Sequence, residues 1–129
     1  MRVLYVDDDR INVLLFEQTC RLAADLHVEV ALSGAEALEV VGRWQPQVLV
    51  IDRHLSDGDG CELLPRLRSS LDAPALPAFL CMADHRDDAV PVARAAGFTG
   101  CWPKPVELGA LLRDLDILRE AAAPQESTR

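Results

Sequence analysis

The chain has 129 residues, which is enough for one domain with a sizeable hydrophobic core. Hydrophobic residues make up 50% of it and charged residues 26%, a composition that excludes an intrinsically disordered protein. The formal net charge is −8 and there is no basic block, so direct binding to nucleic acid or to an anionic membrane surface is not expected.

Neither a membrane span nor a secretory leader is recognisable, so we expect a cytoplasmic protein. No apolar run approaches the ~20 residues that a transmembrane helix needs. The cysteines lie far apart without a CxxC pair, which favours reduced thiols over disulfides or a metal site. They are Cys20, Cys61, Cys81 and Cys101.

Short apolar segments alternate with segments of helical periodicity along the chain. Strands are expected at residues 2–6, 28–32, 47–51, 77–82 and 99–102. Helices are expected at residues 11–26, 34–44, 61–70, 87–97 and 106–121. Strict alternation of five strands with five helices predicts an α/β fold, in which a parallel sheet carries helices on both faces.

Local signals mark several ends of these elements. Ser33 should cap the second helix, with Glu36 completing a capping box, and Gly97 should end the fourth helix. Pro65 and Pro91 should each lie in a first helical turn or at a kink. Periodicity fades at the C-terminus, so we expect a domain at residues 1–120 and a tail or linker stub at residues 121–129.

Charged residues follow three of the predicted strands. Asp7, Asp8 and Asp9 come after the first strand, Asp52 after the third and Lys104 after the fifth. The carboxyl ends of parallel strands meet at one edge of a sheet, so we expect most of these side chains to converge. Asp9 has a simpler role as a helix cap, and "DGDG" at 57–60 is typical of a turn that feeds the third helix.

Converging carboxylates require a cation. Two carboxylates ~5 Å apart repel by about 3 kcal/mol at an effective dielectric constant near 20, and a single lysine cannot offset three of them. Mg²⁺ (or Mn²⁺) suits one or two carboxylates together with waters and a phosphate. Mg²⁺ and a lysine also neutralise a phosphoryl group, and a carboxylate can accept that group as an acyl phosphate. Asp52 is the best placed nucleophile, because it ends the central strand alone.

The chain resembles the receiver domain of two-component response regulators over residues 1–120. The matching stretches are "VLYVDDDRINVLL", "PQVLVIDRHLSDGDGCELLPRLR" and "AAGFTGCWPKPVELGALL". The wording "IDRHLSDGDG" is most similar to receivers attached to hybrid histidine kinases. The resemblance implies a flavodoxin-like, doubly wound (βα)5 fold with strand order 2-1-3-4-5.

The resemblance also implies a role for each site residue. Asp52 would accept a phosphoryl group, and Lys104 would contact the phosphoryl oxygens. Asp8, Asp52 and the backbone carbonyl of His54 would bind Mg²⁺ directly, while Asp7 would hold a metal-bound water. The peptide bond before Pro105 would be cis.

Partners are implied in the same way. The donor would be a histidine kinase or a histidine phosphotransfer protein. A downstream protein would bind the face formed by the fourth helix, fifth strand and fifth helix. A homodimer through the last helix is left open.

The chain departs from the family at the two switch positions. Met82 stands where the family has Thr or Ser, and its sulfur is only a weak acceptor. Cys101 stands where the family has an aromatic residue, with Trp102 as its neighbour. His54 and Asp84 match positions that tune hydrolysis of the acyl phosphate, although His54 could equally be a surface residue.

The expected function is that of a phosphoacceptor domain, which is not an enzyme but assists its own phosphorylation and dephosphorylation. Three other functions are alternatives. A phosphorylation-independent pseudo-receiver, acting as an interaction module, would explain Met82 and Cys101. A phosphatase of the haloacid dehalogenase type needs an acid two residues after Asp52, where this chain has His54. Flavin binding is disfavoured, because "DDDR" would repel the flavin phosphate.

Overall fold

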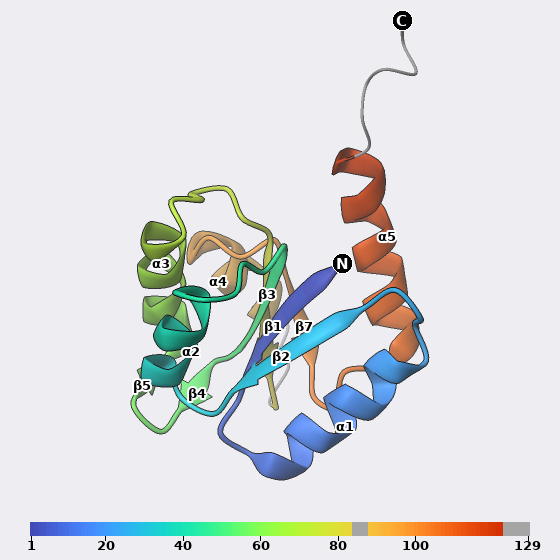
Figure 1. Ribbon diagram of the computed structural model, residues 1–129, viewed down its shortest axis with the longest axis horizontal. Helices are drawn as coiled ribbons and strands as arrows, with labels where there is room; N and C mark the ends of the chain where they lie inside the picture. The colour runs from blue at the N-terminus through green and yellow to red at the C-terminus, as the bar shows by residue number, and fades with distance from the viewer. Residues whose placement is uncertain (84–87, 123–129) are drawn as a thin grey trace, which may run out of the picture.

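The computed structural model of the chain describes residues 1–83 and 88–122, so Asp84 lies outside the described residues. Its main sheet has five parallel strands in the order β2-β1-β3-β6-β7 (Figure 1). These strands are β1 (Arg2–Val6), β2 (His27–Ala31), β3 (Val48–Asp52), β6 (Ala78–Met82) and β7 (Gly100–Pro103). This is the predicted order 2-1-3-4-5, and the flavodoxin-like (βα)5 fold is confirmed.

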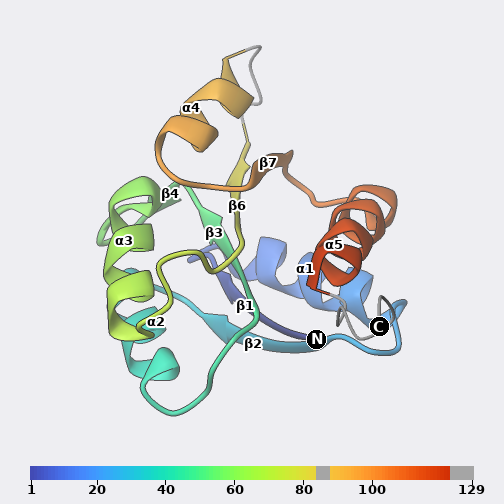
Figure 2. The same ribbon diagram turned by 90° about the horizontal axis from the view of Figure 1, so that it is seen from above.

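Helices connect successive strands of the sheet, as the alternating pattern predicts. They are α1 (Arg10–Arg21), α2 (Gly34–Val41), α3 (Gly60–Ser70), α4 (Ala89–Ala95) and α5 (Leu108–Ala122). In Figure 2, α2 and α3 lie on one side of the sheet, and α1 and α5 lie on the other. The sheet is therefore covered on both faces, which is why its central strand β3 is buried throughout and is apolar from Val48 to Ile51, before it ends in Asp52.

Two hydrophobic clusters fill the space between the sheet and its helices. On the side of α2, α3 and α4, Leu49, Ile51 and Leu80 contribute to the first cluster. On the side of α1 and α5, Val50 and Cys81 contribute to the second. Successive residues of β3 and β6 thus face opposite layers, as the two-residue period of a strand requires.

Aromatic pairs consolidate the layer formed by α1 and α5. Tyr5 of β1 stacks on Phe16 of α1 with ring centroids 4.1 Å apart. Phe79 of β6 stacks on Trp102 of β7 at 4.3 Å. All four rings are almost completely buried, so each pair adds to the burial of apolar area on this side of the sheet.

The first helix is shorter than predicted. It ends at Arg21 rather than residue 26, where the amide of Leu22 donates to the carbonyl of Thr19 and the amide of Ala23 donates to that of Cys20. The amide of His27 must reach the carbonyl of Met1, 2.9 Å away, to begin β2. The chain therefore has to turn before β2, although apolar residues continue through the connection.

Capping follows the sequence signals with one change. The hydroxyl of Ser33 accepts the amide of Glu36 at 3.0 Å, as predicted. The carboxylate of Glu36 accepts the amide of Leu32 rather than that of Ser33, so the reciprocal half of the capping box is shifted by one residue. Gly97 follows α4 with φ of +98°, the left-handed conformation expected at a helix end.

The two helix prolines lie at different positions in their helices, and the loop after β3 contains an additional hairpin. Pro91 lies in the first turn of α4, whereas Pro65 lies beyond the first turn of α3. A two-stranded antiparallel hairpin, β4 (His54–Leu55) and β5 (Gly58–Asp59), follows β3 and was not predicted. Strands of two residues are too short to show a period.

Within the described residues, no helix combines the length and the hydropathy needed to cross a membrane.

Candidate functional site

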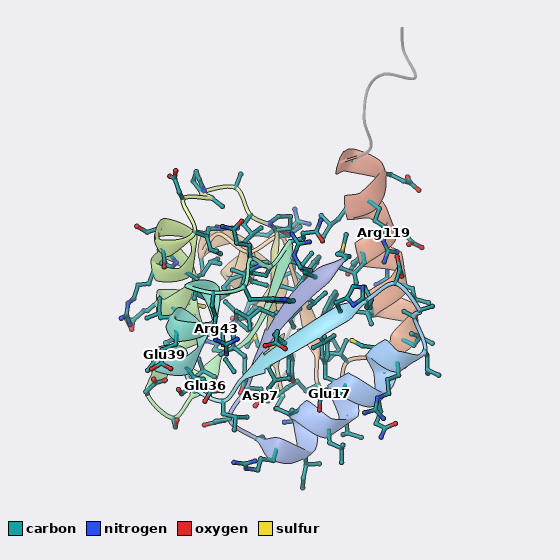
Figure 3. All side chains as sticks on the ribbon, in the orientation of Figure 1. Asp7, Glu17, Glu36, Glu39, Arg43 and Arg119 are labelled. Carbon is teal, nitrogen blue, oxygen red and sulfur yellow. The ribbon has the colours of Figure 1, made fainter. Side chains whose placement is uncertain are left out.

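Three carboxylates converge at the carboxyl edge of the sheet. Asp7 and Asp8 follow β1, and Asp52 is the last residue of β3, the strand next to β1. One oxygen of each carboxylate lies within 4.8 Å of the others. Asp7 is fully buried, Asp52 is 4% exposed and Asp8 is exposed. Figure 3 labels Asp7 at this end of the sheet.

Lys104 lies among these carboxylates, as the strand-end argument predicts. Its Nζ is 3.2 Å from Oδ1 of Asp52 and 3.4 Å from Oδ2 of Asp7. Its backbone amide donates to the carbonyl of Met82 at 3.1 Å, which continues the pairing of β6 and β7 beyond the strands. The peptide bond between Lys104 and Pro105 is cis, as the resemblance implies.

The electrostatics of this cluster are unfavourable to the charge on Asp52. Burial raises the pKa of Asp52, the negative charge of Asp7 raises it further, and Lys104 and the His54 amide only partly oppose these effects. Burial lowers the pKa of Lys104, but the charges of Asp52 and Asp7 outweigh burial and raise it. The lysine is therefore held as a cation, and the cluster still carries an excess of negative charge.

The donor set fits a hard divalent cation. Oxygens from three carboxylates gather at one point, and oxygen ligands are those that Mg²⁺ prefers. Asp7 is already committed, because its Oδ1 accepts the amide of Asp9 at 2.9 Å and its Oδ2 accepts the hydroxyl of Tyr5 at 2.7 Å. Asp8 and Asp52 therefore have more freedom than Asp7 to serve as direct ligands.

Tyr5 is a site residue that the sequence analysis missed. Its ring is buried between β1 and α1, and its hydroxyl donates to a carboxylate of the acidic cluster. The signal was present, because Tyr5 lies two residues before Asp7 and so on the same face of the strand. In an apolar strand, however, a tyrosine is usually part of the core.

Other acidic residues near the site stabilise the backbone. Asp9 caps α1 by accepting the amides of Ile11 and Asn12, and Asp59 caps α3 by accepting the amide of Cys61. The turn predicted at residues 57–60 lies at residues 56–57, while 58–59 form β5 and Gly60 begins α3, so the segment feeds the third helix as predicted but as a hairpin.

Asp57, at the tip of the hairpin, joins it to the neighbouring helix. Its two carboxylate oxygens accept the amides of Gly34 and Ala35 at the start of α2, each at 2.9 Å. These bonds lower the pKa of Asp57. The loop that follows the candidate nucleophile is therefore fastened to α2.

The predicted switch positions lie on the α3 and α4 side of the site. Met82 ends β6, half-buried, and Cys101 pairs with Leu80 across β6 and β7. Both side chains pack against the first hydrophobic cluster. Trp102 points to the opposite layer, where its indole donates to Asp114 at 2.6 Å, so it does not occupy the switch position of its neighbour.

The remaining residues considered in the sequence are His54 and the four cysteines. The side chain of His54 is exposed at the start of β4. All four cysteines are free thiols, two of them buried and two half-buried. The expectation of reduced cysteines is thus consistent with the fold.

Comparison with known proteins gives relatives over nearly the whole chain. The response regulator MprA of Mycobacterium leprae is 33% identical over 130 residues, which cover 98% of this chain and 54% of that protein. The chain spans about half, or less, of the length of the curated relatives it matches.

Solved structures share the fold. A two-component response regulator from Clostridium difficile has a TM-score of 0.82 at 21% identity, covering 95% of this chain and 99% of that one. The receiver domain of Ssk1 from Saccharomyces cerevisiae, solved with the histidine phosphotransfer protein Ypd1, has a TM-score of 0.80 at 20% identity. That match covers 100% of this chain and 97% of the other.

The model of the response regulator receiver domain family matches residues 3–116. Together with the parallel sheet and its acidic edge, this match shows that the chain belongs to the family of response regulator receiver domains.

Proposed function

We propose that this chain accepts a phosphoryl group on Asp52 from a phosphohistidine and signals through the resulting change in conformation. The observation that carries the proposal is the placement of Asp52. Its carboxylate is almost completely buried, 3.2 Å from Lys104 and beside two further carboxylates. A metal ion held by these carboxylates, together with Lys104, would neutralise the negative charge of an incoming phosphoryl group.

The chain's own residues account for most of the transfer. A carboxylate oxygen of Asp52 attacks phosphorus and the bond from phosphorus to the histidine nitrogen breaks. The imidazole of the donor, already protonated on its other ring nitrogen, then leaves as a neutral group. Lys104, already beside Asp52, would donate to the phosphoryl oxygens. Mg²⁺ (or Mn²⁺) would neutralise charge on those oxygens, held by Asp8, Asp52 and the carbonyl of His54, with Asp7 binding through water.

The proposed donor is a histidine kinase or a histidine phosphotransfer protein. Exposed apolar side chains on α1 support a protein partner beside the site, since Ile11 is 71% exposed, Leu14 55% and Leu15 44%. Ile11 is in the first turn of α1, directly after the acidic cluster. A helical donor resting on this surface could present its phosphohistidine to Asp52.

The proposed output surface is the face of α4, β7 and α5. A hollow of about 280 Å³ lies there, with Val90 and Ile117 exposed at its rim. A downstream protein could bind there, and a homodimer is the second arrangement for the same face. The chain would act as a cytoplasmic signalling domain over residues 1–120, with a tail at 121–129, and not as an enzyme.

The second candidate is a pseudo-receiver that binds partners without phosphorylation. Met82 and Cys101 favour it, because neither offers the hydroxyl or the aromatic ring of the usual switch. The complete set of Asp7, Asp8, Asp52 and Lys104 favours the phosphoacceptor.

Intact mass measured after incubation with acetyl phosphate and Mg²⁺ separates the two functions. A gain of one phosphoryl group that requires Mg²⁺ and is lost in Asp52→Ala is the expected result. A folded protein that binds Mg²⁺ and gains no mass would instead make the pseudo-receiver the better account.

A further inference from the structure

Among residues 1–83 and 88–122, the strand residues on one side of the proposed site offer only weak donors to the phosphoryl group. Lys104 approaches Asp52 from β7 on the side of Asp7. On the α3 and α4 side lie Met82, at the end of β6, and Cys101, within β7, and both pack against the first hydrophobic cluster. A thioether has no proton to donate, and a thiol is a weak donor.

The side chain of Arg53 starts on this same side. Asp52 directs its carboxylate toward Asp7 and Lys104, and successive residues of a strand alternate between faces. Arg53 therefore follows the face of Ile51, which belongs to the first cluster with Met82 and Cys101. Its backbone is fixed, since its amide donates to the carbonyl of Cys81 at 3.0 Å.

Two further observations place the guanidinium near Cys101 and the start of α3. The positive charge of Arg53 lowers the pKa of both Cys61 and Cys101, against the stronger effect of burial. Its Nε lies 4.0 Å from a carboxylate oxygen of Asp59, the cap of α3. Arg53 thus lies between the start of α3 and Cys101 of β7.

The guanidinium is only weakly held in this position. A separation of 4.0 Å is too long for a hydrogen bond, and the other oxygen of Asp59 accepts the amide of Cys61 at 2.8 Å. The Nε of Arg53 is buried, yet it has no hydrogen-bond partner among residues 1–83 and 88–122. A phosphoryl group on the preceding residue would offer this cation a stronger acceptor.

We propose that Arg53 replaces the missing switch hydroxyl by donating hydrogen bonds to the phosphoryl oxygens of Asp52. This inference rests on the proposed function, because it requires a phosphoryl group on Asp52. Phosphorylation would draw the guanidinium away from Asp59. The conformational change caused by phosphorylation would then be transmitted by Arg53 to the start of α3 and to the surroundings of Cys101. It would not depend on a hydroxyl at the end of β6.

The test compares Arg53→Gln with the wild type and with Arg53→Gln/Met82→Thr. Beryllofluoride, an analogue of the phosphoryl group, is titrated in the presence of Mg²⁺ and its binding is followed by NMR. We expect Arg53→Gln to bind beryllofluoride about tenfold more weakly, the effect of losing about 1.4 kcal/mol. Adding Met82→Thr should restore the affinity to within about threefold, because the hydroxyl then supplies the donor.

Arg43→Gln is the matched control. It removes the same charge from a residue whose side chain is 66% exposed and paired with Glu29 of the edge strand β2. This variant should bind beryllofluoride as the wild type does. Thermal unfolding of every variant, and intact mass after treatment with acetyl phosphate, show whether each one is folded and takes up phosphate.

The outcomes separate this inference from the proposed function. A wild type that is phosphorylated while Arg53→Gln keeps full affinity for beryllofluoride would overturn only the role of Arg53. Weak binding that Met82→Thr does not restore would also overturn it, because the loss would then reflect general electrostatics. A wild type that neither gains mass nor binds beryllofluoride would remove the proposed function, and this inference with it.

Discussion

The buried carboxylate of Asp52 is kept beside Asp7 at a cost to stability. Replacing Asp52 by Asn removes the charge and keeps the shape. In metal-free buffer at pH 7, we expect Asp52→Asn to raise the free energy of unfolding by about 1 kcal/mol. The relief of repulsion between close carboxylates, about 3 kcal/mol, is offset in part by loss of the ion pair with Lys104.

The same variant gives a pH dependence whose sign can be worked out. The pKa of Asp52 is raised in the folded chain above the unfolded value of about 4. The contribution of Asp52 to the free energy of unfolding is therefore fully present below about pH 4, and it is lost as the pH rises through the pKa of Asp52 in the folded chain. Urea unfolding from pH 4 to pH 8 should show Asp52→Asn gaining on the wild type as pH rises. A difference that stays constant with pH would contradict this assignment.

Tyr5 offers a second test at the residue scale. Tyr5→Phe keeps the stacking on Phe16 and removes the hydroxyl that donates to Asp7. We expect the free energy of unfolding to fall by about 1.5 kcal/mol, the typical value of a hydrogen bond to a charged group. Mg²⁺ affinity should fall as well, because Asp7 would be less firmly oriented. Unchanged stability in urea unfolding would show that the hydroxyl does not hold Asp7.

At the scale of elements, the start of α3 is packed directly against the end of β3. A Cβ added at Gly60 would overlap the backbone carbonyl of Asp52 and lie 2.9 Å from the side chain of Ile51. The amide of Gly60 also donates to the carbonyl of Arg53 at 2.8 Å. The loop carrying the proposed ligands therefore depends on a glycine at this position.

We expect Gly60→Ala to lower the free energy of unfolding by about 2–3 kcal/mol, because the helix and the strand must separate to admit the methyl group. Gly109→Ala is the control, since a Cβ at Gly109 in α5 meets nothing within 4 Å. That substitution should raise stability by about 0.5–1 kcal/mol through helix propensity. Equal effects at the two glycines, measured by urea unfolding, would argue against the close contact.

The exposed apolar residues of α1 lead to a prediction about the donor. Ile11→Glu should slow phosphoryl transfer from a histidine phosphotransfer protein by tenfold or more, because it places a charge in the proposed contact. Phosphorylation by acetyl phosphate, which needs no protein contact, should be unchanged. Equal slowing with both donors would locate the effect in the site itself rather than in docking.

The sequence allowed most of this arrangement to be anticipated, for a reason that lies in the sheet. Strand ends in a parallel sheet meet at one edge, so Asp7, Asp52 and Lys104 could be brought together from their positions alone. Tyr5 and Arg53 could not be found so easily, because their roles depend on where long side chains extend. The periodicity of hydropathy shows which face of a helix or strand a residue lies on, but not the direction in which a long side chain extends.

At the scale of the whole molecule, metal binding and folding should be coupled. A cation that binds only the folded acidic cluster stabilises it by about 1.4 kcal/mol at tenfold excess over its dissociation constant. For a domain of this size we expect Mg²⁺ to raise the melting temperature by about 4 °C. Asp8→Asn, which alters the exposed member of the cluster, should reduce this shift strongly. A shift of the same size in Asp8→Asn would place the metal elsewhere.

The placement of Trp102 gives the protein a built-in optical reporter. Its indole is stacked on Phe79, bonded to Asp114 of α5 and two residues from Lys104, whereas the second tryptophan, Trp44, packs at the opposite layer. Any displacement of β7 against α5 alters the surroundings of one indole and spares the other. Fluorescence emission from a Trp44→Phe variant should therefore follow the response of this face in real time, without an attached dye.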